Sequence, residues 1–172
     1  ARRREALTYY HRTGPIGDVL AAVARDPAKK IGAVGLGAGS LASFAAARQA
    51  WTYFEIDPVV LKLARDERYF TFLRDSPADL WVVLGDARRS LVAERDAAFD
   101  LLMLDAYSSD AIPMHLVTRE ALALYARKLA PGLFTWSPDA GPPIQIERAP
   151  VETLAWTPQG DALAYSVGGE RP

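Results

Sequence analysis

Short apolar runs recur along the first 133 residues, and amphipathic stretches with helical spacing separate them. Four of these runs are typical of buried strands, and they are Lys30–Leu36, Trp51–Ile56, Leu80–Leu84 and Phe99–Leu104. Strands that alternate with helices favour a parallel sheet covered on both faces, and crossovers in such sheets are nearly always right-handed. In open sheets of this kind, ligands bind beyond the carboxyl ends of the strands.

Helical stretches lie between the apolar runs. Ser40–Arg48 is rich in alanine and contains no helix breaker, so it predicts a helix. Asp57 and Pro58 begin another, because aspartate caps a helix well and proline suits its first turn. Thr118–Leu129 has apolar residues at helical spacing and ends at Pro131–Gly132. The sequence therefore predicts an α/β fold with a Rossmann-like, doubly wound and mostly parallel sheet.

The pattern changes after Leu133, where glycine and proline become frequent and helical spacing stops. We therefore divide the chain into a domain at residues 1–133 and a β-rich segment at residues 134–172. Three short strands in this segment predict an antiparallel meander, and they are Ile144–Arg148, Val151–Trp156 and Ala162–Val167. The turn at residues 157–161 favours a hairpin between the last two.

The β-rich segment also contains two short similar stretches, Phe134–Asp139 and Leu154–Gly160. They resemble segments of a β-propeller blade, which would make residues 134–172 a truncated or foreign blade. The alternative is that these strands complete the far edge of the main sheet.

Composition narrows the class of protein. Of 172 residues, 50% are hydrophobic and 24% are charged, as in a globular domain. The net charge of −1 provides no electrostatic reason to expect a nucleic-acid partner, and the basic run at residues 2–4 is typical of a solvated tail. No apolar stretch is long enough to cross a bilayer. The absence of cysteine excludes disulfides and thiolate chemistry and is consistent with the cytoplasmic location that we expect. Two histidines without an acidic ligand pattern predict no metal site.

A glycine turn follows the first predicted strand. Gly35, Gly37 and Gly39 let the backbone turn sharply and let a ligand approach where a side chain would clash. The predicted helix after them would direct free N–H groups and the positive end of its dipole at that ligand. Ser40 occupies the place of the third glycine of the nicotinamide fingerprint, which argues against that cofactor. A tight turn without a ligand is the alternative.

Acidic residues follow the other predicted strands. Glu55 lies about 20 positions past the first glycine, where a carboxylate binds ribose hydroxyls. Asp57 follows the same strand. Asp86, followed by Ala87, is placed to accept a hydrogen bond from an adenine amino group. The alternatives are a solvated strand-end charge for Glu55 and a helix cap for Asp86.

Asp105 ends the most apolar strand, where a carboxylate is unfavourable unless it is partnered or faces a cleft. We therefore expect it to orient an amine nucleophile as the catalytic residue. The loop after it, which contains Tyr107 and Asp110, is expected to bind substrate, although Asp110 has helix capping as its alternative. Tyr10 and His11 are further candidates for the substrate pocket, with a packed aromatic and a surface histidine as the alternative.

Residues 7–133 resemble the spermidine synthase family, which has an S-adenosylmethionine-dependent methyltransferase-like fold. The residues that carry the resemblance are Tyr10–His11, Gly35–Gly39, Glu55–Asp57, Gly85–Ala87, Asp105 with its loop, and the helix that ends at Leu129–Gly132. The resemblance implies ribose binding by Glu55, adenine contact by Asp86, and an amine held by Asp105. The implied reaction moves an aminopropyl group from decarboxylated S-adenosylmethionine to a diamine such as putrescine. A homodimer is compatible with this resemblance, and no metal is implied.

Two departures from the family pattern affect the amine side of the site. Arg12 follows Tyr10–His11 where the family has glutamate, and Asp110 lies five positions after Asp105 instead of three. Arg12 also suggests an alternative, a methyltransferase in which it pairs with the carboxylate of intact S-adenosylmethionine. A second alternative is a nucleotide-binding module without catalysis.

Overall fold

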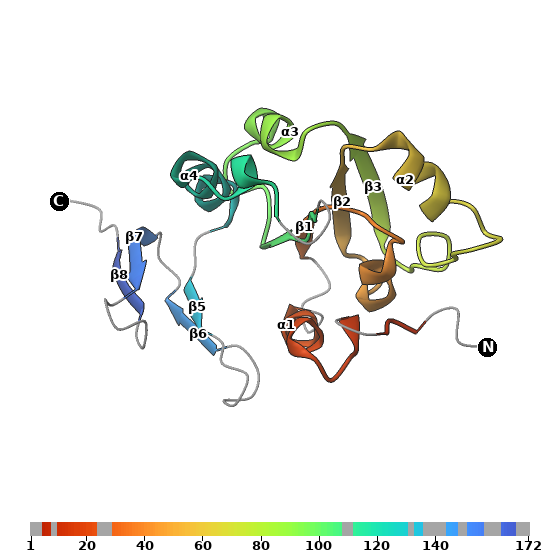
Figure 1. Cartoon of the computed structure of the whole chain (residues 1–172). Coiled ribbons are helices and arrows are strands. Elements are labelled where there is room, and N and C mark those ends of the chain that lie inside the picture. Colours follow the sequence, from red (N-terminus) through yellow and green to blue (C-terminus); the bar gives the residue numbers. More distant parts are fainter. Residues whose placement is uncertain are drawn as a thin grey trace.

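The computed structural model describes residues 5–7, 10–23, 29–107, 112–130, 133–135, 144–147, 151–156 and 163–167 (Figure 1). At its centre is a four-stranded parallel sheet in the order β3-β2-β1-β4. The strands are β1 (Lys30–Val34), β2 (Ala50–Glu55), β3 (Asp79–Leu84) and β4 (Leu101–Leu104). Each of the four apolar runs therefore forms a strand of one parallel sheet, and the predicted α/β fold is confirmed.

Helices cover both faces of this sheet. One face packs against α1 (Pro15–Val23), η2 (Ser40–Phe44) and α2 (Pro58–Ala64). The other packs against α3 (Ala87–Ala93), η3 (Met114–Leu116) and α4 (Arg119–Lys128). The sheet is therefore doubly wound, as the alternation of strands and helices predicted.

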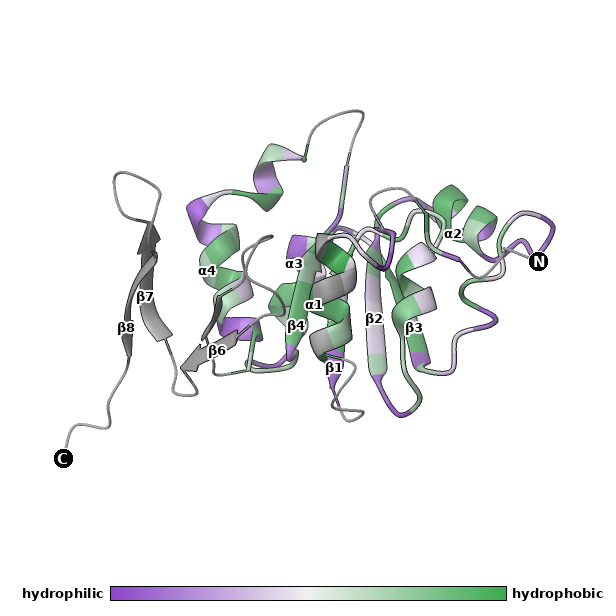
Figure 2. Ribbon diagram, turned by 90° about the horizontal axis from the view of Figure 1, so that it is seen from below, coloured by the Kyte–Doolittle hydropathy of each residue, from purple (hydrophilic) through white to green (hydrophobic). Residues whose placement is uncertain are grey.

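The strands divide their side chains between the two faces because successive residues point in opposite directions. On β2, Trp51 and Tyr53 join the core beneath α1 and α2, whereas Phe54 joins the core beneath α3 and α4. On β1, Ala33 and Val34 divide in the same way. Figure 2 shows hydrophobic residues along β3, β4 and α2 and hydrophilic residues on the connecting loops. The sheet thus separates two hydrophobic cores.

The helix predicted at Ser40–Arg48 is shorter than expected. It is a 3-10 helix that ends at Phe44, because Ala45 has extended backbone angles (φ −63°, ψ 137°). Leu41, Ala42 and Phe44 are all buried in this one turn. The alanines that follow Phe44 therefore do not extend the helix, although alanine has a high helix propensity.

The C-terminal strands form two separate antiparallel pairs. β5 (Leu133–Thr135) pairs with β6 (Ile144–Glu147), and β7 (Val151–Trp156) pairs with β8 (Leu163–Val167). The strands lie where the sequence predicted them, but they do not form one continuous meander or extend the main sheet. The turn predicted at residues 157–161 and much of the two blade-like stretches lie outside the described residues.

The two adjacent residues Leu91 and Val92 of α3 test the packing of this face. Leu91 is fully buried, whereas 64% of Val92 is exposed. We expect Leu91→Ala to lower the free energy of unfolding by about 2–5 kcal/mol because it leaves a cavity against the sheet. Val92→Ala is the control and should change it by less than about 0.5 kcal/mol. Denaturant unfolding measures both, and equal effects would contradict the packing described.

Candidate functional site

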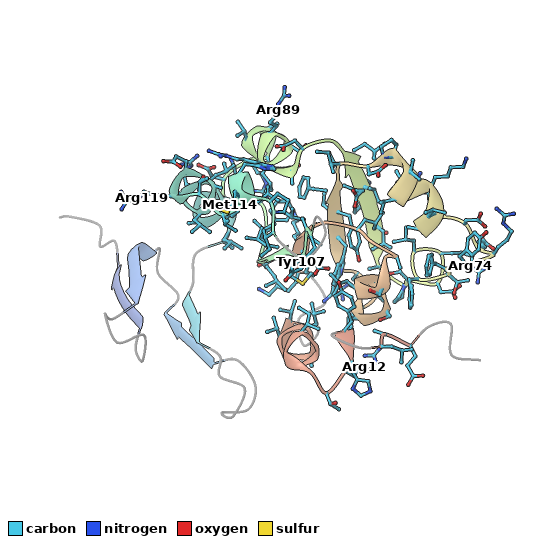
Figure 3. All side chains as sticks on the ribbon, in the orientation of Figure 1. Arg12, Arg74, Arg89, Tyr107, Met114 and Arg119 are labelled. Carbon is cyan, nitrogen blue, oxygen red and sulfur yellow. The ribbon has the colours of Figure 1, made fainter. Side chains whose placement is uncertain are left out.

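A cavity of about 890 Å³ opens at the carboxyl ends of the four parallel strands. It has the size of a small-molecule site. Its lining comes from all four strand ends, the first turn of α3 and the η3 segment. The polar and glycine residues among its lining are Tyr10, Gly35, Gly37, Glu55, Asp57, Gly85, Asp86, Asp105, Tyr107 and His115. Figure 3 labels Tyr107 on the loop after β4 and Met114 at the start of η3.

The glycine turn packs directly against the loop that contains Asp105. The N–H of Gly35 donates to the carbonyl of Phe54 at 2.9 Å, and its φ of 97° lies in the left-handed region. A Cβ atom at this position would be 2.6 Å from the carbonyl oxygen of Asp105. Glycine is therefore required at 35 by the neighbouring backbone itself, in addition to any ligand.

The three predicted glycines do not share one role. Gly35 and Gly37 line the cavity, but Gly39 does not, and its Cβ would meet Leu73 at 2.9 Å. Gly39 instead precedes η2 with a φ of 77°. Because η2 is a 3-10 helix of five residues, the strong helix dipole expected after the turn is absent.

Glu55 is buried and connects two loops. Its Oε2 accepts a hydrogen bond from the N–H of Leu36 at 3.0 Å, and its Oε1 accepts one from the N–H of Asp57 at 2.8 Å. These bonds satisfy a carboxylate that is only 7% exposed. Each oxygen retains a lone pair, so Glu55 can still accept hydrogen bonds from a ligand in the cavity.

Asp57 and Asp86 are both helix caps that line the cavity. Asp57 accepts from the N–H of Val59 at 2.7 Å, and Asp86 Oδ1 accepts from the N–H of Arg89 at 2.9 Å. Asp86 therefore caps a helix with one of its two oxygens, as the alternative interpretation expected. Its other oxygen, Oδ2, lies 3.0 Å from Nε2 of His115, one of the two histidines for which the sequence predicted no metal site and no other role. Ala87 is buried beside Asp86 and also lines the cavity.

Asp105 is paired with Tyr10 across the cavity. The hydroxyl of Tyr10 donates to Asp105 Oδ2 at 2.7 Å. Burial raises the pKa of Asp105 above its ordinary value, and the hydrogen bond from Tyr10 partly opposes that rise. The fold therefore brings Tyr10 and Asp105, which the sequence singled out separately, into direct contact in the lining of one cavity.

The other residues expected on the amine side lie differently. His11 is exposed, does not line the cavity, and has Nδ1 at 2.8 Å from Thr13 Oγ1. Arg12 donates to the carbonyl of Ser43 at 2.8 Å and lies over the Phe44 ring at 4.9 Å. Tyr107 lines the cavity and is 64% exposed. Asp110 lies outside the described residues.

Tyr53 is a second tyrosine near Asp105 that the sequence did not single out. It is fully buried, and its hydroxyl has no hydrogen-bond partner among the described residues. Burial first, and the charge of Asp105 second, raise the pKa of Tyr53 far above its ordinary value. The phenol is therefore neutral. Its only sequence signal was its place on a strand that ends in acidic residues.

The charge of the lining is uniformly acidic. Glu55, Asp57, Asp86 and Asp105 contribute four carboxylates, and neither lysine nor arginine lines the described cavity. Low-dielectric walls with one sign of charge concentrate ligands of the opposite sign.

Within the described residues, no group of three or more histidine or acidic side chains could hold a metal ion. No helix in the same residues is long and apolar enough to cross a membrane.

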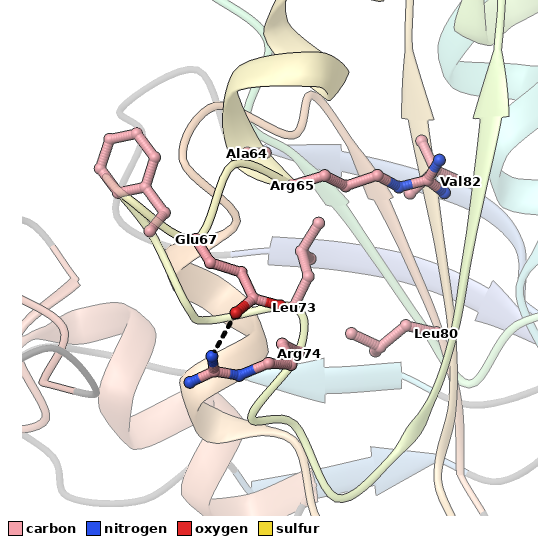
Figure 4. A pocket seen from close by; sticks show the side chains of 8 residues that line it. Ala64, Arg65, Glu67, Leu73, Arg74, Leu80 and Val82 are labelled. Carbon is pink, nitrogen blue, oxygen red and sulfur yellow. Dashed lines mark hydrogen bonds and ion pairs between the residues drawn. The ribbon is translucent and has the colours of Figure 1, made fainter.

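A smaller cavity of about 400 Å³ lies between α2, β3 and the segment that joins them (Figure 4). Apolar side chains such as Leu73, Leu80 and Val82 line it. An ion pair of 2.6 Å between Arg74 and Glu67 borders it, and both side chains are more than half exposed. It contains none of the strand-end carboxylates, so the larger cavity is the candidate site.

Comparisons with known proteins agree with this fold. No protein-family model matches the chain. A polyamine aminopropyltransferase of Vibrio vulnificus is 38% identical over 94 residues, which cover 52% of this chain and 30% of that protein. A probable spermidine synthase from Corynebacterium glutamicum has a TM-score of 0.63 and 23% identity, covering 78% of this chain and 48% of that one. A proposed O-methyltransferase from Klebsiella pneumoniae has a TM-score of 0.50 and 22% identity, covering 69% of this chain and 52% of that one.

The resemblance to spermidine synthases is therefore present in both the sequence and the fold. The methyltransferase-like sheet is shared as well. The chain spans about a third of the length of the curated relative and about half of the two structural relatives.

The contact between Tyr10 and Asp105 predicts a titration shift. We expect Tyr10→Phe to raise the pKa of Asp105 further, because the hydrogen bond that favours the carboxylate is lost while burial remains. The carboxyl ¹³C chemical shift of Asp105 as a function of pH measures this. His11→Ala is the control and should leave the titration unchanged, since His11 contacts Thr13 instead. An unchanged Asp105 titration in Tyr10→Phe would contradict the pairing.

Proposed function

We propose that this chain binds decarboxylated S-adenosylmethionine and transfers its aminopropyl group to a small amine. The observation that carries the proposal is the lining of four carboxylates without lysine or arginine. Decarboxylated S-adenosylmethionine carries a sulfonium and an ammonium group, and a diamine adds further positive charge. An acidic cavity favours both reactants. The likeness to a polyamine aminopropyltransferase over 94 residues supports the same function.

In this proposal the nucleoside half lies along β1, β2 and β3. Each oxygen of Glu55 accepts only one backbone N–H and keeps a free lone pair. These free lone pairs accept hydrogen bonds from the ribose hydroxyls. The exposed side chain of Ile56 and the buried Leu116 line the same cavity and offer apolar surface to the base. Asp86 then accepts a hydrogen bond from the adenine amino group.

The reacting half lies at Asp105. The sulfonium supplies a good leaving group, so the protein mainly aligns the amine, takes up its proton and excludes water. The amine nitrogen bonds to the carbon beside sulfur, the carbon–sulfur electron pair goes to sulfur, and methylthioadenosine leaves. Asp105 takes up the proton, and its raised pKa suits it to act as a base. Tyr10 holds the carboxylate in place by its 2.7 Å hydrogen bond.

The structure gives less support to the methyltransferase alternative. That alternative depends on Arg12 as the partner of the methionine carboxylate. Arg12 is instead engaged with the Ser43 carbonyl and the Phe44 ring, and it is not among the residues that line the cavity. A carboxylate ligand would face four like charges without a cation. We propose putrescine as the first amine to test. We also propose that the chain acts in the cytoplasm.

Cosubstrate preference tests the charge argument. We expect decarboxylated S-adenosylmethionine to bind at least about tenfold more tightly than intact S-adenosylmethionine, which corresponds to about 1.4 kcal/mol. Isothermal titration calorimetry with both ligands and with methylthioadenosine measures this. Tighter binding of the intact cofactor would favour methyl transfer, and no binding of any of the three would overturn the proposal.

Asp105→Asn separates catalysis from nucleotide binding. We expect turnover with putrescine to fall by about 10²–10⁴-fold, because the base is lost, while the affinity for methylthioadenosine stays within about threefold. Glu55→Gln should instead mainly weaken the binding of methylthioadenosine. Asp79→Asn, at the exposed amino end of β3, is the matched control and should change neither. Methylthioadenosine binding without turnover in the unmodified protein would indicate a non-catalytic module.

A further inference from the structure

The proposed adenine acceptor already has a partner within the protein. Asp86 Oδ2 lies 3.0 Å from Nε2 of His115, and its Oδ1 is used by the N–H of Arg89. Both oxygens of Asp86 are therefore engaged before any nucleotide binds. The proposed function requires one of them to receive the amino group of adenine, and Oδ2 is the oxygen that no backbone group holds.

His115 is placed by two contacts between η3 and α3. Its ring reaches Asp86, and its backbone carbonyl accepts a hydrogen bond from Arg88 at 3.2 Å. The neighbouring Leu116 is buried in the core beneath α3 and α4, so the short η3 turn is fixed at its apolar side. The imidazole is 52% exposed and lines the cavity, so a ligand can reach and displace it.

An imidazole N–H and an adenine amino N–H are alike as hydrogen-bond donors. Both are planar nitrogen donors that can bind the same carboxylate oxygen. The geometry points to His115 as an internal stand-in for adenine: its Nε2–H occupies Asp86 Oδ2 in the free protein, and the amino group of the base competes with it for that oxygen. This inference rests on the proposed function. It assigns to His115 a role in setting nucleotide affinity and base specificity.

The size of the effect follows from the exposure of the pair. Ion pairs and charge-assisted contacts of partly exposed groups are individually weak. Removing a competitor of that strength should tighten the binding of an adenine nucleoside by about two- to fivefold. Replacing a residue that only supports the fold, or one that helps to hold the base, would leave the affinity unchanged or weaken it.

The test compares two nucleosides that differ at one position of the base. Methylthioadenosine carries the exocyclic amino donor, whereas methylthioinosine carries an oxo acceptor at the same position and has no exocyclic N–H to donate to Asp86. We expect His115→Ala and His115→Phe to bind methylthioadenosine about two- to fivefold more tightly than the unmodified protein. Both variants should bind methylthioinosine unchanged within about 1.5-fold, since that ligand does not compete for Asp86 Oδ2.

Two features of the design keep the result interpretable. Phe retains a ring of similar shape, so agreement between the two variants separates the loss of the donor from the loss of bulk. Met114→Ala is the matched control, because Met114 is in the same turn, is 77% exposed and does not line the cavity. It should leave both affinities unchanged. Thermal unfolding of each variant checks that η3 remains folded.

Several outcomes would overturn the inference. Weaker or unchanged methylthioadenosine binding in both variants would mean that His115 does not compete with the base. An equal gain for methylthioinosine would mean that the substitutions only widen the cavity. In either case methylthioadenosine still binds, so the proposed function survives. If neither nucleoside binds to any of the proteins, the proposed function fails and takes this inference with it.

Discussion

The buried carboxylate of Glu55 holds together the strand ends on which the whole candidate site depends. Its two oxygens accept N–H groups from Leu36, in the loop after β1, and from Asp57, two positions beyond the end of β2. Its backbone carbonyl accepts from Gly85, which begins the loop after β3. One residue therefore fixes three loops before any ligand is present. Such preorganisation lowers the conformational cost of binding.

The fourth strand end is attached by close packing instead of a side-chain bond. Gly35 leaves no room for a Cβ against the Asp105 carbonyl, and Asp105 donates its N–H to Val34 at 2.8 Å. The loop that contains Asp105 is thus in direct backbone contact with the glycine turn. Glu55 and Asp105, which we propose for the nucleoside and the amine, both contact the glycine turn, through Leu36 and Gly35 respectively.

The sequence predicted the sheet, and most of the residues it suggested for the nucleotide half of the site line one cavity, because local signals specify both. Apolar runs marked all four strands. Asp57 begins a helix as predicted, and Asp86 also caps a helix, which was the alternative interpretation of that residue. Contacts between distant residues were harder to foresee. His115 contacts Asp86, which is 29 positions away in the sequence, and no motif in the residues next to His115 predicts that contact. The sequence suggested Arg12 as a partner for a carboxylate ligand. Its guanidinium instead lies over the Phe44 ring and donates a hydrogen bond to the Ser43 carbonyl.

The strand order also decides when this cavity can exist. β1 lies between β2, which begins 20 residues after it, and β4, which begins about 70 residues after it. Closing the longer loop is entropically more costly, so pairing of β4 is expected to follow pairing of β1 with β2. During synthesis, β1 has one open edge until Leu104 has left the ribosome. The residues of the glycine turn are therefore synthesised early, but they form one wall of the cavity only after β4 has paired with β1.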